Sequence, residues 1–331
     1  MIWPGHDPAH VAQAAQWLAQ GRLLGFPTET VYGLGADAQQ DEAVMAIYAA
    51  KGRPTGHPLI VHIAEADDAV HFADPIPDFA LALMQAHWPG PLTLILPRRH
   101  GVAGASAAHQ PSIGLRCPSH PVAQSLLRAA RLLGVMGVSG PSANRFGRVS
   151  PTRAEHVERE FGADLPVLDG GPCAVGIESA IVDCTRGEPV LLRPGMLQAD
   201  RLSISAGRPV RTPGEGGLAM PGPAPKASGT LASHYAPDAR VRLLDDEAMA
   251  QAAHTLAPSQ LAQIAVWSPQ PPRFAPGRWR AMPTDAGACA HELFQVLRDF
   301  EAWGAKEIWV SPVPADPAWD GVRDRLTRAS H

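Results

Sequence analysis

Long apolar runs and an export signal are both missing from this 331-residue sequence. No stretch approaches the roughly 20 consecutive apolar residues that a membrane-spanning helix requires. The first residues, MIWPGHDPAHVAQ, have no basic region followed by an apolar core, so they do not resemble a signal peptide. By elimination, we expect a cytoplasmic protein that does not contact a membrane.

Cysteine is scarce, and the four cysteines are far apart in the sequence: Cys117, Cys173, Cys184 and Cys289. No C-x-x-C pair is present, so the spacing favours neither a zinc site nor a disulfide framework. A reducing compartment fits this pattern.

Lysine is also rare, because Lys51, Lys226 and Lys306 are the only lysines among 28 basic residues. The formal net charge is −4, and charged residues make up 18% of the chain. No global positive field draws such a protein to nucleic acid or to an anionic membrane. An anionic substrate must therefore be held by a few local cations.

The common nucleotide-binding and catalytic motifs are absent as well. No lysine follows a glycine, which excludes a Walker A loop, and Gly33 and Gly35 lack the third glycine of a dinucleotide-binding loop. The sequence has no H-R-D kinase loop, no G-x-S-x-G elbow and no H-E-x-x-H zinc helix. If this protein uses ATP, it holds the phosphates in another way.

Helical and strand patterns alternate irregularly over residues 1–208, which predicts an α/β domain with a mixed sheet. Asp7-Pro8 and Gly21 have the residue types that begin and end a helix. Thr152 and Glu155 have the spacing of a capping box and predict the start of another helix. Further helices are expected over residues 41–50, 78–88 and 120–133. Strands are expected over residues 23–26, 59–63, 92–96, 113–116, 135–139, 180–184 and 190–193.

The composition changes after residue 208. Residues 209–238 are rich in glycine and proline and lack periodicity, so they are expected to form a linker or an ordered loop. Residues 239–331 carry three strand patterns separated by helical patterns. We expect them to form a small three-layer α/β domain.

Five polar segments stand at predicted strand or helix ends. They are FPTETVYGLG (26–35), KGRPTGHPLIVHI (51–63), SIGLRCPSH (112–120), SGPSANRFGRVSPT (139–152), and Glu178-Ser179 together with Arg193-Pro194-Gly195. Each segment alone also fits an ordinary turn or a helix end. Together they supply hydroxyls and cations without an evident base or nucleophile. That combination suits adenylyl transfer, which depends on positioning and charge neutralisation.

The cations in these segments allow two interpretations each. Lys51 and Arg53 close a helix, where they can offset the helix dipole, or they can clamp a polyphosphate. Arg116 ends a short apolar strand, and a buried arginine there needs an anionic partner. That partner can be a ligand carboxylate or an internal aspartate or glutamate.

In order along the chain, FPTETVYGLGADA, KGRP, HPLIVHI, PSAN, SPT, GIESAIVD and LLRPG resemble the YrdC-like threonylcarbamoyl-AMP synthase family. The later ASHYAP resembles the long, two-domain form, in which the linker folds back over the active site. The resemblance implies a concave α/β domain with a twisted mixed sheet over residues 1–208. It also implies a linker over 209–238 and a smaller Rossmann-like α/β domain over 239–331.

The resemblance further implies a nucleotidyltransferase that makes L-threonylcarbamoyladenylate and pyrophosphate from L-threonine, bicarbonate or CO2, and ATP. Such an enzyme serves the N6-threonylcarbamoyladenosine modification of tRNA, and a downstream tRNA threonylcarbamoyl transferase receives its product. Mg2+ is implied as the counter-ion of the triphosphate, with no other metal site. Whether tRNA binds directly is left open.

The resemblance also assigns residues to the two substrates. The threonine-binding residues implied are Thr30, His62, Arg116, Gly140 and Ser179. The ATP-binding residues implied are Lys51, Arg53, His57, Ser112, Ser142, Asn144, Ser150, Arg193 and Tyr235, of which Lys51 and Arg53 are also the catalytic candidates. The sequence departs from the usual family pattern at His57, where asparagine is common, and at Gly140, where the family usually has alanine.

Two alternatives compete with this interpretation. A relative that makes carbamoyl-adenylate carries acylphosphatase-like and zinc-finger segments, and the lack of C-x-x-C pairs argues against it. A non-catalytic module of the same fold that binds structured RNA needs a basic stripe, which a net charge of −4 disfavours.

Overall fold

The computed structural model describes residues 1–212, 224–229 and 235–331, and the rest of the predicted linker lies outside them. The chain divides into two compact units. The first unit comprises Met1–Phe146, Pro151–Ala174 and Glu178–Thr230, and the second comprises Gly147–Ser150, Val175–Ile177 and Leu231–His331. No helix among the described residues has the length and apolar character needed to cross a membrane.

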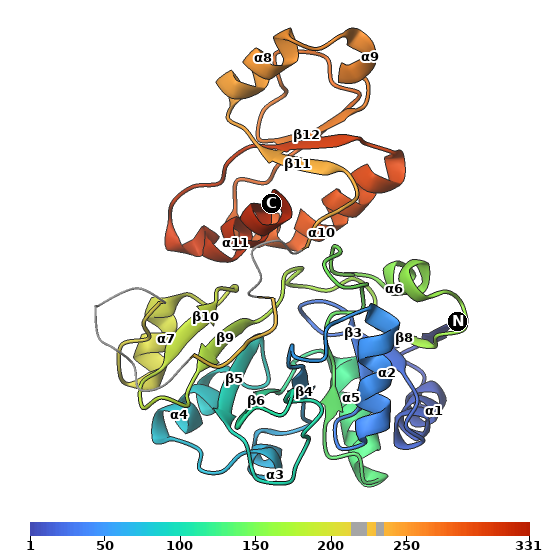
Figure 1. Ribbon diagram of the computed structural model, residues 1–331, viewed down its shortest axis with the longest axis vertical. Coiled ribbons are helices and arrows are strands. Elements are labelled where there is room, and N and C mark those ends of the chain that lie inside the picture. Colours follow the sequence, from blue (N-terminus) through green and yellow to red (C-terminus); the bar gives the residue numbers. More distant parts are fainter. Residues whose placement is uncertain (213–223, 230–234) are drawn as a thin grey trace. The chain divides into compact units, whose positions relative to one another are not determined.

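A ten-stranded mixed sheet forms the centre of the first unit (Figure 1), which confirms the predicted sheet type. Its strand order is β1-β8-β2-β3-β7-β4-β6-β5-β9-β10. The sheet contains parallel pairs, such as β4 with β6, and antiparallel pairs, such as β5 with β6. The strands are β1 (Ile2–Pro4), β2 (Leu24–Phe26), β3 (Gly33–Asp37), β4 (Ile60–His62), β5 (Leu92–Pro97), β6 (Ser112–Arg116), β7 (Val138–Ser139), β8 (Val167–Asp169), β9 (Ala180–Asp183) and β10 (Val190–Arg193).

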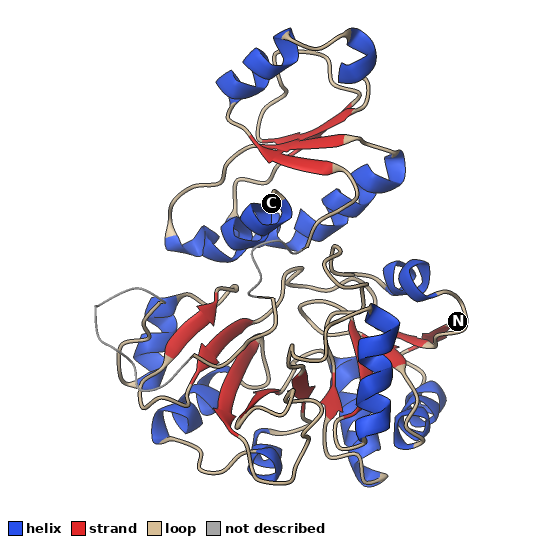
Figure 2. Cartoon of the chain, in the orientation of Figure 1, coloured by secondary structure: helices blue, strands red, loops and turns tan. Residues whose placement is uncertain are grey.

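Helices lie beside this sheet (Figure 2). They pack on it through separate apolar clusters. Leu18 and Leu126 pack with Phe26 in one cluster, whereas Ile47 packs with Leu34 in another. The helices are α1 (Pro8–Ala19), α2 (Asp41–Lys51), α3 (Ala69–Phe72), α4 (Asp78–His87), α5 (Pro121–Leu132), α6 (Ala154–Phe161) and α7 (Ala199–Ala206), with a 3-10 turn η1 (Ala66–Asp68).

Capping explains several of these boundaries. Asp7 accepts a hydrogen bond from the amide of Ala9 at the start of α1, and Pro8 occupies the first turn, as predicted. Gly52 ends α2 in the left-handed conformation, with φ of 63°. The capping box predicted at Thr152 was wrong, because Arg153 is the N-cap of α6 and makes no side-chain capping bond.

Strand β3 lies in a segment whose polar and glycine-rich composition favoured a turn. Its glycines have a packing reason, because a Cβ on Gly33 would lie 2.7 Å from the ring of Phe26. A Cβ on Gly35 would lie 3.0 Å from the same ring. The close antiparallel pairing of β3 with β2 therefore requires both glycines.

The second unit contains a four-stranded parallel sheet in the order β11-β14-β12-β13. Figure 2 shows helices on both of its faces, which confirms the predicted small Rossmann-like α/β architecture. The strands are β11 (Arg240–Leu243), β12 (Ile264–Ser268), β13 (Arg278–Ala281) and β14 (Glu307–Val310). The helices are α8 (Asp246–His254), α9 (Pro258–Leu261), α10 (Ala286–Trp303) and α11 (Asp320–Ala329), with a 3-10 turn η2 (Pro317–Trp319).

The packing of α1 on the sheet yields a stability prediction. Leu18 is fully buried in the cluster around Phe26, so Leu18→Ala should reduce the free energy of unfolding by about 2–5 kcal/mol. Leu132→Ala is the matched control, because Leu132 is 88% exposed and its truncation should change the free energy by less than about 0.5 kcal/mol. Urea denaturation followed by tryptophan fluorescence measures both, and equal losses would contradict this packing.

Candidate active site

The ends of four neighbouring strands bring distant polar residues together in the first unit. His62 at the end of β4 is the register partner of Arg116 at the end of β6. Strand β5 pairs with β6 on the other side, and Thr93 of β5 lies beside β9. Ser179 directly precedes β9. The threonine-binding residues implied by the sequence therefore converge on one region of the sheet.

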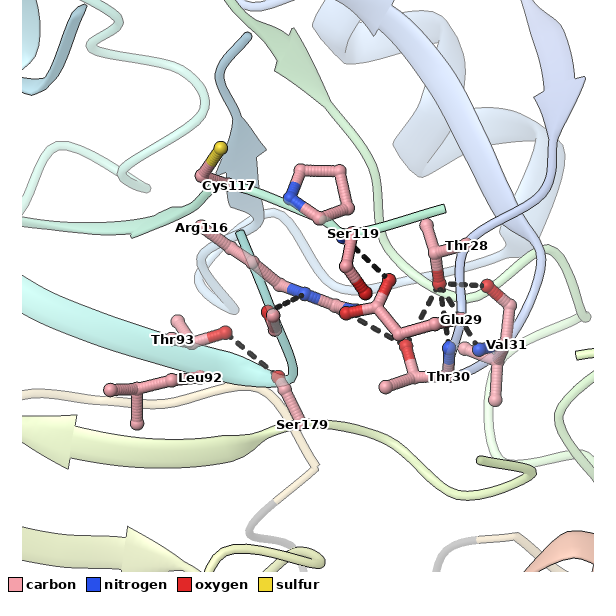
Figure 3. Close-up of polar contacts among 12 residues, drawn as sticks. Thr28, Glu29, Thr30, Val31, Leu92, Thr93, Arg116, Cys117, Ser119 and Ser179 are labelled. Atoms are coloured by element: carbon pink, nitrogen blue, oxygen red, sulfur yellow. Dashed lines mark hydrogen bonds and ion pairs between the residues drawn. The ribbon is translucent and has the colours of Figure 1, made fainter. Parts of the chain in front are cut away.

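The guanidinium of Arg116 is buried at the centre of this region, with 4% of the residue exposed. Its Nη1 donates to the hydroxyl of Thr30 at 2.8 Å, and its Nε donates to the carbonyl of Gly90 at 3.3 Å. Its Nη2 lies 2.6 Å from a carboxylate oxygen of Glu29 (Figure 3). The internal carboxylate that a buried arginine needs is thus Glu29.

A tight turn at Thr28 presents Glu29 and Thr30 to Arg116. The hydroxyl of Thr28 accepts hydrogen bonds from the amides of Thr30 and Val31, both at 3.2 Å. It also lies 2.8 Å from the hydroxyl of Thr30 (Figure 3). Glu29 is fixed from its other side by the amide of Ser119, at 3.1 Å. The local hydroxyl-to-backbone bonds hold this turn in one shape.

Ser179 connects Arg116's neighbourhood to a second arginine. Its hydroxyl lies 2.8 Å from the hydroxyl of Thr93 (Figure 3). The guanidinium of Arg193 donates to the carbonyl of Ser179 from Nε at 3.1 Å and from Nη2 at 3.0 Å. The two predicted substrate-binding residues Ser179 and Arg193 are therefore direct neighbours.

His62 and Gly140 are packed against each other and against Phe26. The His62 and Phe26 rings meet edge to face at 5.5 Å, and a Cβ on Gly140 would lie 2.9 Å from Nδ1 of His62. Burial, followed by the charge of Arg116, lowers the pKa of His62 to about 3. The imidazole is consequently neutral at physiological pH and can only donate or accept hydrogen bonds.

Lys51, predicted as a catalytic cation, is hydrogen-bonded to the loop after β7. It is buried, and its ammonium donates to the carbonyl of Ser142 at 2.6 Å and to the carbonyl of Asn144. Burial, followed by the charge of Arg53, lowers the pKa of Lys51 well below its usual value. Lys51 therefore holds together the loop that carries two other predicted ATP-binding residues.

Arg53 is placed rigidly beside the predicted nucleotide residue His57. Its guanidinium donates to the carbonyl of His57 at 3.3 Å and to the carbonyl of Pro58 at 3.0 Å. It also donates to the hydroxyl of Ser228 at 3.2 Å. Burial, then the charges of Arg53 and Lys226, lowers the pKa of His57. The proline-rich turn after α2 thus presents the cation in a fixed position.

The remaining predicted ATP-binding residues fall into both units. Ser112 begins β6 and lines a small pocket in the first unit. Ser150 and Tyr235 belong to the second unit. There the Tyr235 ring is buried, with Phe294 at 5.5 Å and the guanidinium of Arg325 5.4 Å from the ring centre. Their roles in ATP binding stay predictions.

Sequence reasoning missed two residues that the structure places in this region. Glu29 lies in one of the polar segments, but its pairing with Arg116 cannot be predicted from the sequence because the two residues are 87 positions apart. Thr93 lies in the segment LTLILP, which predicts an apolar strand. Its hydroxyl is the one polar side-chain group of that segment, and nothing else in the sequence points to a role for it. The described residues contain no group of three or more histidine, cysteine or carboxylate side chains that could hold a metal ion.

Two protein-family models cover nearly all of the chain. The Sua5/YciO/YrdC model, described as "Telomere recombination", matches residues 16–195. The model of the threonylcarbamoyl-AMP synthase C-terminal domain matches residues 202–331. This chain belongs to the Sua5/YciO/YrdC family. The two matches confirm the resemblance to the long, two-domain form.

Members of this family that carry the name threonylcarbamoyl-AMP synthase are similar over most of the chain. The Bacillus subtilis protein is 40% identical over 72% of this chain and 68% of its own length. The Schizosaccharomyces pombe protein is 31% identical over 93% of this chain and 84% of its own length. The structure of Pyrococcus abyssi Sua5 complexed with L-threonine has a TM-score of 0.86, at 32% identity over 98% of this chain and 95% of that one.

The crowding at Gly140 yields a prediction about side-chain size. An alanine Cβ there would lie 2.7 Å from the Phe26 ring as well as close to His62, so one of these rings must move. Gly140→Ala should cost about 1–3 kcal/mol of unfolding free energy and raise the KM for threonine. Gly104→Ala is the control, because its Cβ would meet nothing closer than 3.6 Å. A Gly140→Ala protein as stable as the wild type would contradict the observed packing.

The lowered pKa of His62 predicts a pH dependence of stability. Below pH 6.5 the unfolded chain binds a proton at this residue, whereas the folded chain does so only near pH 3. Stability from this group is therefore complete above pH 6.5 and is lost as the pH falls toward 3, at up to about 1.4 kcal/mol per pH unit. When the pH falls from 6.5 to 5, the free energy of unfolding of His62→Gln should therefore decrease by about 2 kcal/mol less than that of the wild type. Urea unfolding at both pH values measures the difference, and identical losses would refute it.

Proposed function

We propose that this protein is an L-threonylcarbamoyladenylate synthase, which forms threonylcarbamoyl-AMP and pyrophosphate from L-threonine, bicarbonate or CO2, and ATP. The observation that carries the proposal is the buried Arg116, surrounded by Thr30, His62 and Ser179 and lying in the same unit as Lys51 and Arg53. Membership in a family whose similar members carry this name supports it.

Arg116 is suited to hold the carboxylate of threonine. A guanidinium carries five N–H donors, and Nη1 and Nη2 each have a second hydrogen beyond their contacts with Thr30 and Glu29. Two parallel N–H donors match a carboxylate geometrically. The Pyrococcus abyssi relative was solved with L-threonine, which supports threonine as the substrate here. The neutral imidazole of His62 and the hydroxyl of Ser179 complete a set of polar groups suited to a small amino acid.

Arg53 and Arg193 are suited to the phosphates of ATP, with Lys51 supporting the adjoining loop. Both guanidiniums contact Ser228, so the structure links the two cations through one residue. We assign Ser112, Ser142 and Asn144 to the same nucleotide on the strength of their positions in the first unit. Mg2+ would enter with ATP on its phosphate oxygens and keep most of its waters, as Mg2+ commonly does at nucleotide sites.

The reaction needs positioning and charge neutralisation rather than a nucleophilic side chain. The threonine amine adds to CO2 and loses a proton, which gives an N-carboxy group next to the carboxylate held by Arg116. One oxygen of that group then attacks the α-phosphorus of ATP, and the bond to the β-phosphate oxygen breaks as pyrophosphate leaves. Cations fixed beforehand stabilise the charge that develops in this step.

The same assignment predicts how the product is used and in which compartment the protein works. The product would serve N6-threonylcarbamoyladenosine formation on tRNA, with a tRNA threonylcarbamoyl transferase as its recipient. We place the protein in the cytoplasm, consistent with four cysteines that are all free and buried. The carbamoyl-adenylate and RNA-binding alternatives are not favoured, because residues 202–331 match the threonylcarbamoyl-AMP synthase C-terminal domain.

The decisive experiment measures pyrophosphate released from ATP, bicarbonate and Mg2+ with and without L-threonine. We expect release that depends on threonine, and release at the same rate without threonine would reject the assignment.

Arg116→Lys should raise the KM for threonine about 10- to 100-fold, because a lysine cannot bind a carboxylate through two parallel donors. Arg128→Lys is the control, since the Arg128 side chain is 60% exposed. The KM for ATP should change less than about two-fold in either variant.

A further inference from the structure

Residues 224–229 of the glycine- and proline-rich stretch lie in the first unit, beside the predicted phosphate-binding cations. The amide of Lys226 donates to the side-chain carbonyl of Gln110 at 2.9 Å. The next residue, Ala227, is buried in an apolar cluster with Ile95 and Ile181. This short segment is therefore anchored at two consecutive residues, one bonded to the loop before β6 and the next packed on side chains of β5 and β9.

Ser228 fixes the segment to both predicted phosphate arginines. Its hydroxyl donates to the carbonyl of Pro58 at 2.7 Å and accepts from Nη2 of Arg53 at 3.2 Å. Its carbonyl accepts from Nη1 of Arg193 at 3.0 Å. The position of residue 228 is thus determined by the same two guanidiniums that the proposed function assigns to ATP.

The anchoring places the Lys226 ammonium next to the turn that carries Arg53. A Cβ built on Gly56 would lie 3.8 Å from Nζ of Lys226. The charge of Lys226 also contributes to the lowered pKa of His57, the residue after Gly56. Within residues 1–212, 224–229 and 235–331, no carboxylate forms an ion pair with Lys226. Its positive charge is directed at a region that already contains Arg53.

Like charges that lie close together repel one another, and a bound anion relieves this repulsion. Lys226 lines the same pocket as Ser112 and Ser228. The carboxylate of threonine has its own proposed cation in Arg116, which pairs with Glu29 and donates to Thr30. The anion that suits several cations around this turn is a polyphosphate.

We propose that Lys226 is an additional polyphosphate-binding residue, which adds a cation from the linker to Arg53 and Arg193. This assignment rests on the proposed function, because it takes ATP as the ligand. It gives the described part of the linker a direct role in binding substrate. Lysine suits this role, because its compact ammonium is a point charge that phosphate oxygens can approach from several sides.

The test compares Lys226→Ala and Lys226→Arg with Lys306→Ala, a lysine of the second unit that is also exposed. Equilibrium dialysis measures the Kd of each protein for ATP, for pyrophosphate and for AMP. We expect Lys226→Ala to raise the Kd for ATP and pyrophosphate about 3- to 10-fold while the Kd for AMP changes less than two-fold. Lys226→Arg should restore most of the affinity, and Lys306→Ala should match the wild type.

A second readout does not depend on ATP. In an NMR titration of the ligand-free protein, Lys226→Ala should shift the pKa of His57 upward, whereas Lys306→Ala should not. An unchanged pKa of His57 would show that the ammonium lies elsewhere and would overturn the assignment. An unchanged Kd for ATP, or an equal loss of ATP and AMP affinity, would overturn it as well.

The experiments distinguish a failure of the role proposed for Lys226 from a failure of the proposed enzyme function. Threonine-dependent pyrophosphate release by the wild-type protein, together with wild-type ATP affinity in Lys226→Ala, would reject the role of Lys226 alone. No release by the wild-type protein would reject the proposed function, and the assignment of Lys226 to ATP with it.

Discussion

The burial of the Arg116 guanidinium is the constraint on which the rest of the site depends. A cation removed from water must be matched by charge and by hydrogen-bond acceptors. Glu29 supplies the charge, and Thr30 and Gly90 supply acceptors. Meeting this requirement fixes the turn at Thr28 against the end of β6. The polar groups around Arg116 are therefore already ordered before a ligand arrives.

A continuous series of polar contacts extends from Thr93 and Ser179 toward the nucleotide side. Thr93 contacts Ser179, Ser179 contacts Arg193, and Arg193 contacts Ser228. Ser228 in turn accepts from Arg53. The groups assigned to the amino acid and those assigned to phosphate are thus linked by direct hydrogen bonds in one unit. Such a connected network positions substrates precisely, because each member limits the rotamers of the next.

Much of this arrangement could be predicted from residue types and their spacing. The helix beginning at Asp7-Pro8, the mixed sheet and the second α/β unit all follow from capping and periodicity. Strand β3 was missed, because its glycines resemble a turn in the sequence and only their contact with Phe26 explains them. The start of α6 was misplaced, because its capping geometry depends on a backbone conformation that the residues around Thr152 do not specify.

The sequence by itself determined the inventory of the site, namely which cations and hydroxyls stand at strand ends and which nucleotide motifs are absent. The tertiary structure decided how these groups are used. It assigned Glu29 to Arg116, turned Lys51 toward the carbonyls of a loop, and brought Ser228 to Arg53. The physical reason is that local preferences act over a few residues, whereas a buried charge is satisfied by whichever distant group the packed sheet places beside it.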